Sequence, residues 1–111
     1  MPSTRKLDLL RGTLDLMILQ TLEPGEQHGI AIADRIRQVT RGTFDVKPGS
    51  LFPALHRLEE DGSIAGEWTV TEDGRRIKSY SLTAEGRAQL SSEKRQWSRI
   101  VAAMSQVLGT S

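Results

Sequence analysis

The sequence predicts a mainly α-helical chain that contains one small β-hairpin. Apolar residues recur at helical spacing in several stretches, and the last two of these are separated by a short polar region. In that region, residues 64–70 and 77–82 flank the turn residues Glu72, Asp73 and Gly74, and the second flank alternates apolar with polar side chains. This order is typical of a winged helix-turn-helix followed by a long C-terminal helix.

The first helix, expected over roughly residues 8–22, is apolar on two sides. Leu9, Leu16 and Leu19 lie nearly opposite its main apolar stripe. A surface helix needs only one such stripe, so either this helix is central to the domain or its second stripe meets a partner subunit. For so small a chain we favour the partner subunit.

A second helix is expected over about residues 28–40, with Gly42 as its stop. Ile30, Ala33, Ile36 and Val39 would face inward, and Arg35, Arg37 and Arg41 outward. Residues 43–46 could then pair with the hairpin as a short strand.

Residues 47–62 predict a short third helix with a specified start and stop. Pro48 suits a first helical turn, where its missing N–H costs nothing, and Ser50 offers a second N-cap. Pro53 lies within the first turn if Ser50 is the cap, whereas a start at Pro48 places it where a backbone hydrogen bond is lost. Both starts remain open at this point. Gly62 supplies a left-handed stop.

Leu51, Leu55 and Leu58 recur at helical spacing and predict the buried face of this third helix. Its other faces carry Ser50, Ala54, His56 and Arg57. An ordinary amphipathic helix with a solvated polar face is the alternative interpretation. His56 fits either a DNA contact or a solvated position.

The hairpin carries three cations, Arg75, Arg76 and Lys78, at its tip and on its returning strand. Such residues are well placed to bind phosphates or to reach into a minor groove. Acidic residues match them in number, so a purely solubilising role is the alternative. The position of the hairpin directly after a capped helix favours DNA binding.

The last helix is expected from Thr83, its N-cap, to Leu108, which is longer than so small a core can cover. Apolar residues repeat along it with heptad-like spacing, which predicts an association surface. They are Leu90, Trp97, Val101, Met104 and Leu108. Lys94 interrupts this pattern, so the contact there should be looser. A helix that folds back along its own domain is the alternative.

The chain resembles the PadR family of transcriptional regulators, in its short form with a single C-terminal dimerisation helix. The matching residues are 10–14, 28–29, 48–55, 57–59, 74–76, 80, 82–83 and 85–86. The family usually has Tyr where this chain has Phe52, so any contact of that hydroxyl is absent or replaced here. Residues 96–97 with Ile100, Met104 and Val107 resemble a subgroup found beside permease genes.

The resemblance implies a homodimeric repressor that binds double-stranded DNA at an inverted-repeat operator. It also implies release by a small aromatic or drug-like ligand, since some members place a planar ligand between the dimer helices. Trp97 is the residue here that could stack on such a ligand. A tryptophan in an apolar interface is more often simply part of its core.

Composition excludes several classes of function. The 111 residues carry a net charge of only +1, so any basic DNA-binding surface must be local. Cysteine is absent, which excludes disulfides and thiolate chemistry. The two histidines, His28 and His56, have no nucleophile or metal-ligand partner at a useful spacing, so we expect no enzyme, no metal and no cofactor. No apolar run suggests a signal peptide or a membrane span, and the expected compartment is the cytoplasm.

Two sets of contact residues follow from this interpretation. In the major groove, the third helix would place Ser50, Phe52, Pro53 and Ala54 near base edges. Lys47 and Arg57 would hold flanking phosphates. The hairpin would add DNA contacts from Arg75, Arg76 and Lys78. Dimer contacts would come from Leu9, Leu16, Leu19, Leu90, Trp97, Val101, Met104 and Leu108. Residues 1–82 would form the DNA-binding domain and residues 83–111 the dimerisation helix of one compact unit. A winged-helix module that docks on proteins without binding DNA is the alternative function.

Overall fold

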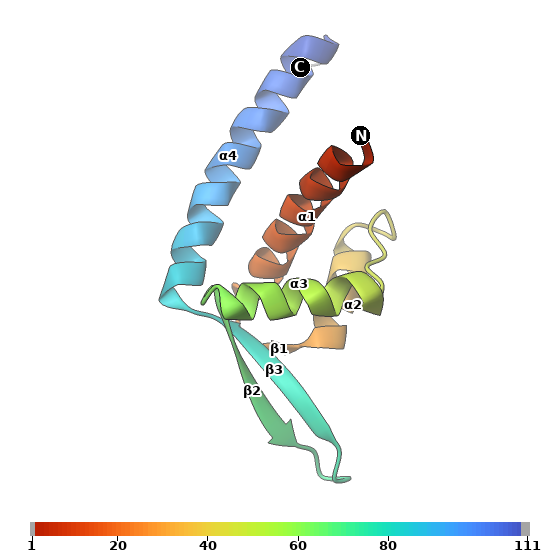
Figure 1. Cartoon of the computed structure of the whole chain (residues 1–111), viewed down its shortest axis with the longest axis vertical. Coiled ribbons are helices and arrows are strands. Elements are labelled where there is room, and N and C mark those ends of the chain that lie inside the picture. The colour runs from red at the N-terminus through yellow and green to blue at the C-terminus, as the bar shows by residue number, and fades with distance from the viewer. Residues whose placement is uncertain (1, 110–111) are drawn as a thin grey trace.

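The computed structural model describes the backbone of residues 2–109 and the side chains of residues 12–109. The elements are α1 (Pro2–Thr21), β1 (Gln27–His28), α2 (Gly29–Val39), α3 (Pro48–Glu60), β2 (Ile64–Val70), β3 (Arg76–Leu82) and α4 (Ala84–Leu108). Figure 1 shows α3 lying across the molecule, with the β2–β3 hairpin projecting on one side and α1 and α4 extending on the other. The predicted mainly α-helical fold with a small hairpin is confirmed.

The core lies where α1, α2 and α3 meet. Its most completely buried side chains are Ile18, Leu19, Leu22, Ile32, Leu51, Leu55, Leu58 and Ile64. The three leucines predicted to form the inner face of α3 are all among them. On α2 the predicted inner face is partly wrong, because Ile36 is buried with Ile32 while Ile30 and Val39 are exposed. Burying each such side chain stabilises the fold by roughly 1.5–3 kcal/mol relative to leaving it in water.

Helix α1 is central to the domain, because it packs against α2, α3 and α4. Its apolar residues are therefore divided among several neighbours, and Leu19 has no exposed surface. The prediction that Leu19 contacts a partner subunit is wrong for this reason. Leu16 is only half-buried. Leu9 lies outside the residues whose side chains are described.

Helix α3 begins at Pro48, so Lys47 and not Ser50 precedes it. The Lys47 carbonyl accepts hydrogen bonds from the N–H groups of Ser50 and Leu51, both at 2.9 Å. Pro53 then lies inside the helix, on its exposed side, where the missing N–H removes one backbone hydrogen bond. Gly62 adopts φ +79° directly after the helix, as the predicted left-handed stop requires.

The sheet has three antiparallel strands in the order β1-β3-β2. Its third strand is Gln27–His28, which pairs with Tyr80 and Ser79 of β3. The prediction that residues 43–46 form this strand is wrong. The chain leaves α2 through two left-handed residues, Arg41 and Gly42, and continues as a loop to α3.

Helix α4 is anchored at its start and extends beyond the core at its end. The Thr83 side chain accepts a hydrogen bond from the Gly86 N–H at 3.0 Å, which confirms the predicted N-cap, and lies 2.5 Å from the Gly62 carbonyl oxygen. Leu90 is only 2% exposed, because the first turns of α4 cover the domain, so its predicted role in a dimer contact is wrong. Large apolar residues further along α4 are exposed: Trp97, Ile100, Val101, Met104, Val107 and Leu108.

Candidate nucleic-acid interface

The rotation of α3 about its axis divides its residues between the core and the solvent. Ala54 is 2% exposed and shares the buried side with Leu51 and Leu58. The prediction that Ala54 reads base edges is wrong, because residues three and four apart on a helix lie on the same face. Its methyl group is part of the core.

His56 lies on the outward side of α3, with 74% of its side chain exposed. Pro53 and Glu60, at helical spacing from it, are exposed as well, and the His56 ring is 3.6 Å from the Glu60 carboxylate. The sequence left two interpretations of His56 open. The sequence already placed His56 opposite the leucine stripe. That position puts its ring on the side of α3 that would face a DNA groove.

Lys47, Ser50 and Phe52 are also exposed at the N-terminal half of α3. The Lys47 ammonium is 2.7 Å from the Asp45 carboxylate, and this hydrogen bond lowers the pKa of Asp45. Both side chains are largely in solvent, where such a pair contributes little. Lys47 therefore remains available to another anion.

Arg57 points away from the outward side of α3. Its guanidinium Nη2 lies 2.5 Å from Oδ1 of Asp15 on α1, and both side chains are partly buried. This ion pair joins the third helix to the central helix. It also contradicts the prediction that Arg57 holds a flanking phosphate, because the charge is directed into the domain.

The face of the hairpin that is turned toward α3 carries an aromatic and cationic cluster. In the sheet register, Trp68 pairs with Lys78 and Gly66 with Tyr80, which places all four side-chain positions on one face. The Arg76 guanidinium lies over the Trp68 ring, 4.6 Å from its centroid. The Lys78 ammonium is 2.8 Å from the Glu59 carboxylate of α3. Of the predicted hairpin cations, Lys78 is thus already paired, whereas Arg76 is held on an aromatic surface.

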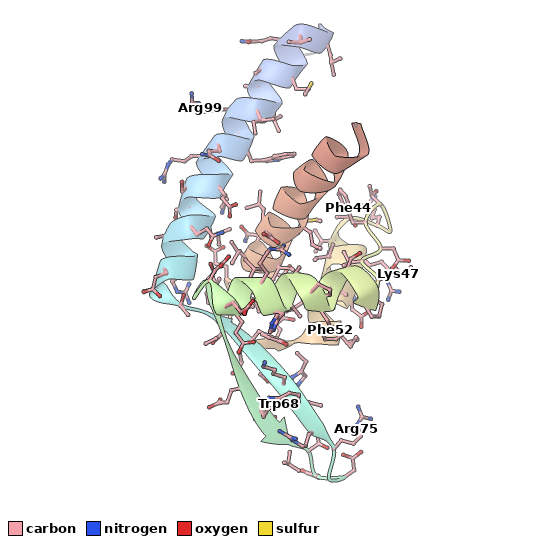
Figure 2. The ribbon with its side chains drawn as sticks, in the orientation of Figure 1. Phe44, Lys47, Phe52, Trp68, Arg75 and Arg99 are labelled. Atoms are coloured by element: carbon pink, nitrogen blue, oxygen red, sulfur yellow. The ribbon has the colours of Figure 1, made fainter. Side chains whose placement is uncertain are left out.

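Arg75 lies at the tip of the hairpin (Figure 2). Its backbone closes the turn through two hydrogen bonds with Thr71. The Arg75 carbonyl accepts from the Thr71 N–H at 2.8 Å, and the Arg75 N–H donates to the Thr71 hydroxyl at 3.1 Å. Its side chain is exposed. In the same view, Lys47 lies at the N-terminal end of α3 and Phe52 on its side toward the hairpin, whereas Arg99 lies on α4, far from both.

A groove of about 430 Å³ separates α3 from the hairpin, and we call it the wing groove. Its lining is mainly aromatic and includes Phe52, His56, Trp68 and Tyr80. Phe52 closes its inner end against α2, where a Cβ on Gly29 would come within 3.0 Å of the Phe52 ring. Exposed cations lie outside the lining of the groove, Lys47 at the start of α3 and Arg75 with Arg76 toward the hairpin tip (Figure 2).

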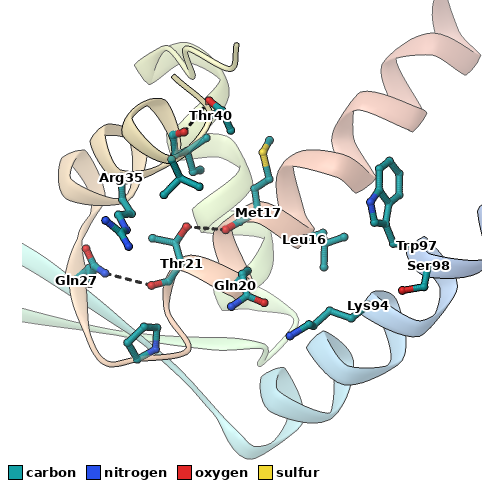
Figure 3. A pocket seen from close by; sticks show the side chains of 13 residues that line it. Leu16, Met17, Gln20, Thr21, Gln27, Arg35, Thr40, Lys94, Trp97 and Ser98 are labelled. Carbon is teal, nitrogen blue, oxygen red and sulfur yellow. Dashed lines mark hydrogen bonds between the residues drawn. The ribbon is translucent and has the colours of Figure 1, made fainter. Parts of the chain in front are cut away.

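A second groove, of about 530 Å³, lies between α1, α2 and α4, and we call it the helix groove (Figure 3). Leu16, Met17 and Trp97 supply apolar walls, and Arg35 and Lys94 supply charge. Hydrogen bonds hold its margin, from the Thr21 hydroxyl to the Met17 carbonyl at 2.8 Å and from the Gln27 amide to the Thr21 carbonyl at 3.1 Å. Of the predicted association residues, Leu16 and Trp97 both line this groove.

In the part of the chain that the structure describes, the His, Asp and Glu residues form no group that could hold a metal ion. None of the helices in that part has the length and apolar character needed to cross a bilayer.

Comparison with known proteins places this architecture in a family. Residues 18–92 match the transcriptional regulator PadR-like family. Transcriptional regulator Rv3488 of Mycobacterium tuberculosis is 38% identical over 85 residues, which is 77% of this chain and 76% of that protein. The chain belongs to the PadR-like family.

Solved structures agree with this assignment. A PadR family transcription regulator from Clostridium difficile R20291 is 33% identical, with a TM-score of 0.75 over 86% of this chain and 97% of that one. A transcriptional regulator from Clostridium thermocellum is 28% identical, with a TM-score of 0.81 over 89% of this chain and 93% of that one. The predicted winged helix-turn-helix with a long C-terminal helix and the predicted family are both confirmed.

The family match covers the two grooves of this PadR-family regulator unequally. Residues 18–92 include α2, α3 and the hairpin, so every residue that lines the wing groove lies within the match. Trp97, Val101, Met104 and Leu108 lie beyond it. The family match therefore gives no information about the exposed end of α4. Any role proposed for that end rests on its own structure.

Proposed function

We propose that this PadR-family regulator is a homodimeric repressor that binds double-stranded DNA through α3 and the hairpin. The observation that carries the proposal is the wing groove with its margins. The outward side of α3 and the hairpin border one open concave surface, and the exposed side chains of α3 and of the hairpin tip take no part in the core. A B-DNA major groove, about 12 Å wide, admits a helix while a hairpin beside it reaches the backbone or the minor groove.

The N-terminal half of α3 is the half that would enter the groove. Ser50, Phe52 and Pro53 are exposed there, Lys47 directly precedes the helix, and His56 is exposed one turn after Phe52. Two exposed carboxylates, Glu60 and Asp61, lie at the C-terminal end and would repel phosphates. Base contacts would thus come from Ser50, Phe52, Pro53 and His56, and phosphate contacts from Lys47, Arg75 and Arg76.

The exposed end of α4 supports the dimer. Trp97, Val101, Met104 and Leu108 are each about half exposed or more, and no described part of the chain covers them. A patch of large apolar side chains of this kind marks an association surface, and a second copy of α4 with Leu16 of α1 is the proposed partner. Two-fold symmetry then requires an inverted-repeat operator with half-sites about 34 Å apart. Residues 1–82 would bind the DNA and residues 83–111 would hold the dimer.

An effector site in the helix groove is the third part of the proposal. Trp97 forms one wall of that groove, and Lys94 and Arg35 could pair with an anionic substituent. A small planar aromatic compound that stacks on Trp97 would alter the packing of α4 against α1. Release of DNA would follow from that change.

A gel-shift assay on the DNA upstream of the gene for this chain tests DNA binding, with random DNA of equal length as the competitor. The proposal expects retardation at nanomolar protein that survives excess random DNA. Sequencing of genomic fragments captured by the protein would then identify the operator and show whether it is an inverted repeat. If no fragment is retained at physiological salt, the chain is not a DNA-binding regulator, and a protein-docking role for the same surface takes its place.

A further inference from the structure

The ammonium group of Lys78 lies in an enclosed position between the hairpin and α3. It is 2.8 Å from Oε1 of Glu59, and the two side chains are only 24% and 30% exposed. The rings of Trp68 and Tyr80 face the same ammonium, each with its centroid 5.5 Å away. The hydrogen bond with Glu59 raises the pKa of Lys78, so the group stays charged at every physiological pH.

Gly66 makes room for this arrangement. A Cβ at position 66 would overlap Cε of Lys78 and would lie 2.9 Å from the Glu59 carboxylate. Any side chain there would displace the lysine or the glutamate. The close approach of hairpin and helix therefore depends on the glycine as well as on the two charges.

We propose that Lys78 is a positioning residue, whose ion pair with Glu59 fixes the angle between the hairpin and α3 and so sets where Arg75 and Arg76 meet DNA. This inference rests on the proposed DNA-binding function and gives Lys78 a role other than the one predicted from the sequence. The sequence predicts that Lys78 contacts DNA directly, but its ammonium is paired with Glu59 and most of its side chain is covered by the domain. A phosphate would have to displace Glu59 in order to bind it.

The variant Glu59→Gln distinguishes a positioning role of Lys78 from direct phosphate binding, because the two roles predict opposite changes in operator affinity. If Lys78 positions the hairpin, loss of the carboxylate loosens the hairpin and weakens operator binding by about tenfold, which corresponds to ~1.4 kcal/mol. If Lys78 instead binds phosphate, the same change frees the ammonium and removes a repelling charge, so binding becomes tighter. Tighter binding by Glu59→Gln overturns the proposal.

The salt dependence of binding gives a second criterion. Lys78→Gln should weaken binding but leave the slope of log K against log salt unchanged, because every phosphate contact is still made. The double variant Glu59→Gln with Lys78→Gln should cost no more than either single change, since both remove one interaction. A slope reduced by about one unit in Lys78→Gln would assign the lysine to a phosphate.

Glu60→Gln is the matched control. It removes the same charge from the next residue of α3, but Glu60 lies on the outward side and faces His56, not Lys78. Its loss should tighten DNA binding slightly, since only repulsion is removed. Equal weakening by Glu59→Gln and Glu60→Gln would show that the effect is not specific to the ion pair.

A readout without DNA keeps this inference separate from the proposed function. The chain contains only two tryptophans, so Trp97→Phe assigns the indole N–H signal of Trp68 in an NMR spectrum. Glu59→Gln and Lys78→Gln should each lower the order parameter of that signal, whereas Glu60→Gln should not. If wild-type protein binds no DNA but the order parameter falls as described, the proposed function fails and the positioning role stands. An unchanged order parameter in both variants overturns the positioning role.

Discussion

At the scale of single residues, helix rotation separates the side chains that can read DNA from those that hold the fold. Ala54 and His56 are two positions apart on α3, yet one is buried in the core and the other projects into solvent. Helical geometry causes this contrast, since a step of two residues turns the side chain to nearly the opposite direction.

Ala54→Glu should unfold the domain or destabilise it severely. The substitution places a carboxylate of larger volume between Leu51 and Leu58, where neither its charge nor its size is accommodated. Leu55→Ala should cost about 2–5 kcal/mol at the same interface through loss of packing. Thermal melting followed by circular dichroism measures both effects, with the exposed Gln38→Ala as a control that should change little.

His56→Ala should have the reverse profile. Melting should be nearly unchanged, because the side chain is exposed, while the ratio of operator to random-DNA affinity should fall by about tenfold if the ring contacts a base edge. Competition binding measures that ratio. An unchanged ratio would show that His56 is only solvated and that Ser50, Phe52 and Pro53 account for the reading.

At the scale of elements, the hairpin combines a rigid base with a cationic end. Lys78 and Glu59 join the base to α3, whereas Arg76 is held over Trp68 nearer the tip. An arginine that stacks on an aromatic ring loses less freedom when it binds a phosphate, since its orientation is already restricted.

Changing both Arg75 and Arg76 to Ala should weaken binding to all sequences alike. It should also reduce the slope of log K against log salt by about two units, because each arginine would no longer bind its phosphate. Titrations between low and physiological salt measure the slope. Arg99→Ala, which removes a cation from α4 far from the hairpin, should leave it unchanged (Figure 2). An unaltered slope in the double variant would exclude the hairpin from the DNA interface.

The contact between α4 and α1 contains a carboxyl group whose burial raises its pKa, that of Glu93. Nearby Asp15 acts in the same direction, and the hydrogen bond from Gln89 opposes it. Since the folded state binds the proton more tightly than the unfolded state, Glu93 favours folding most below its ordinary pKa. This contribution is lost as the pH rises through the pKa of the folded state.

Glu93→Gln should therefore raise the melting temperature slightly at pH 7, because it removes a partly desolvated charge beside Asp15. At a pH below the ordinary pKa of a glutamate, the wild type is protonated in both states, and the difference should disappear. Melting at several pH values between about 3.5 and 7 measures this. Glu85→Gln, at an exposed position in the first turn of α4, is the control and should not raise the melting temperature at pH 7, because a carboxylate near a helix N-terminus is favourable and is not desolvated there.

At the scale of the whole molecule, the length of α4 is the main structural fact. The molecule extends 55 Å along its longest axis, against 29 and 27 Å along the others, and α4 follows the long direction past the core (Figure 1). A helix that leaves its domain with one apolar side has that side available for association, because nothing in its own described fold covers it.

Met104→Glu should convert a dimer into a monomer, since a charge at the centre of an apolar interface is desolvated without a partner. DNA affinity should then fall by a factor of about 100 or more, on the order of the loss of one half-site, although every base-contacting residue is intact. Sedimentation at micromolar concentration measures the first effect and a gel shift the second.

Gln106→Glu adds the same charge to the opposite side of α4 and serves as the control. It should remain a dimer with ordinary affinity, because residue 106 is rotated by nearly half a turn from Met104. A wild-type chain that sediments as a monomer would overturn the dimer, whatever the variants do.

The local features of this protein follow from its amino-acid sequence alone. Three such features are the leucine spacing of α3, the left-handed Gly62 and the Thr83 cap. Each is set by residues within a few positions of one another, and all were predictable. The family resemblance follows from the same local residues.

Apolar contacts and ion pairs between elements that are distant in the sequence were visible only in the tertiary structure. Leu19 and Leu90 are buried because α1 and the first turns of α4 share one core, although their patterns fitted an exposed contact equally well. Arg57 binds Asp15, 42 positions away, and Lys78 binds Glu59, 19 positions away. Periodicity gives the face of a helix on which a residue lies, but the element opposite that face is fixed by packing, which no local pattern encodes.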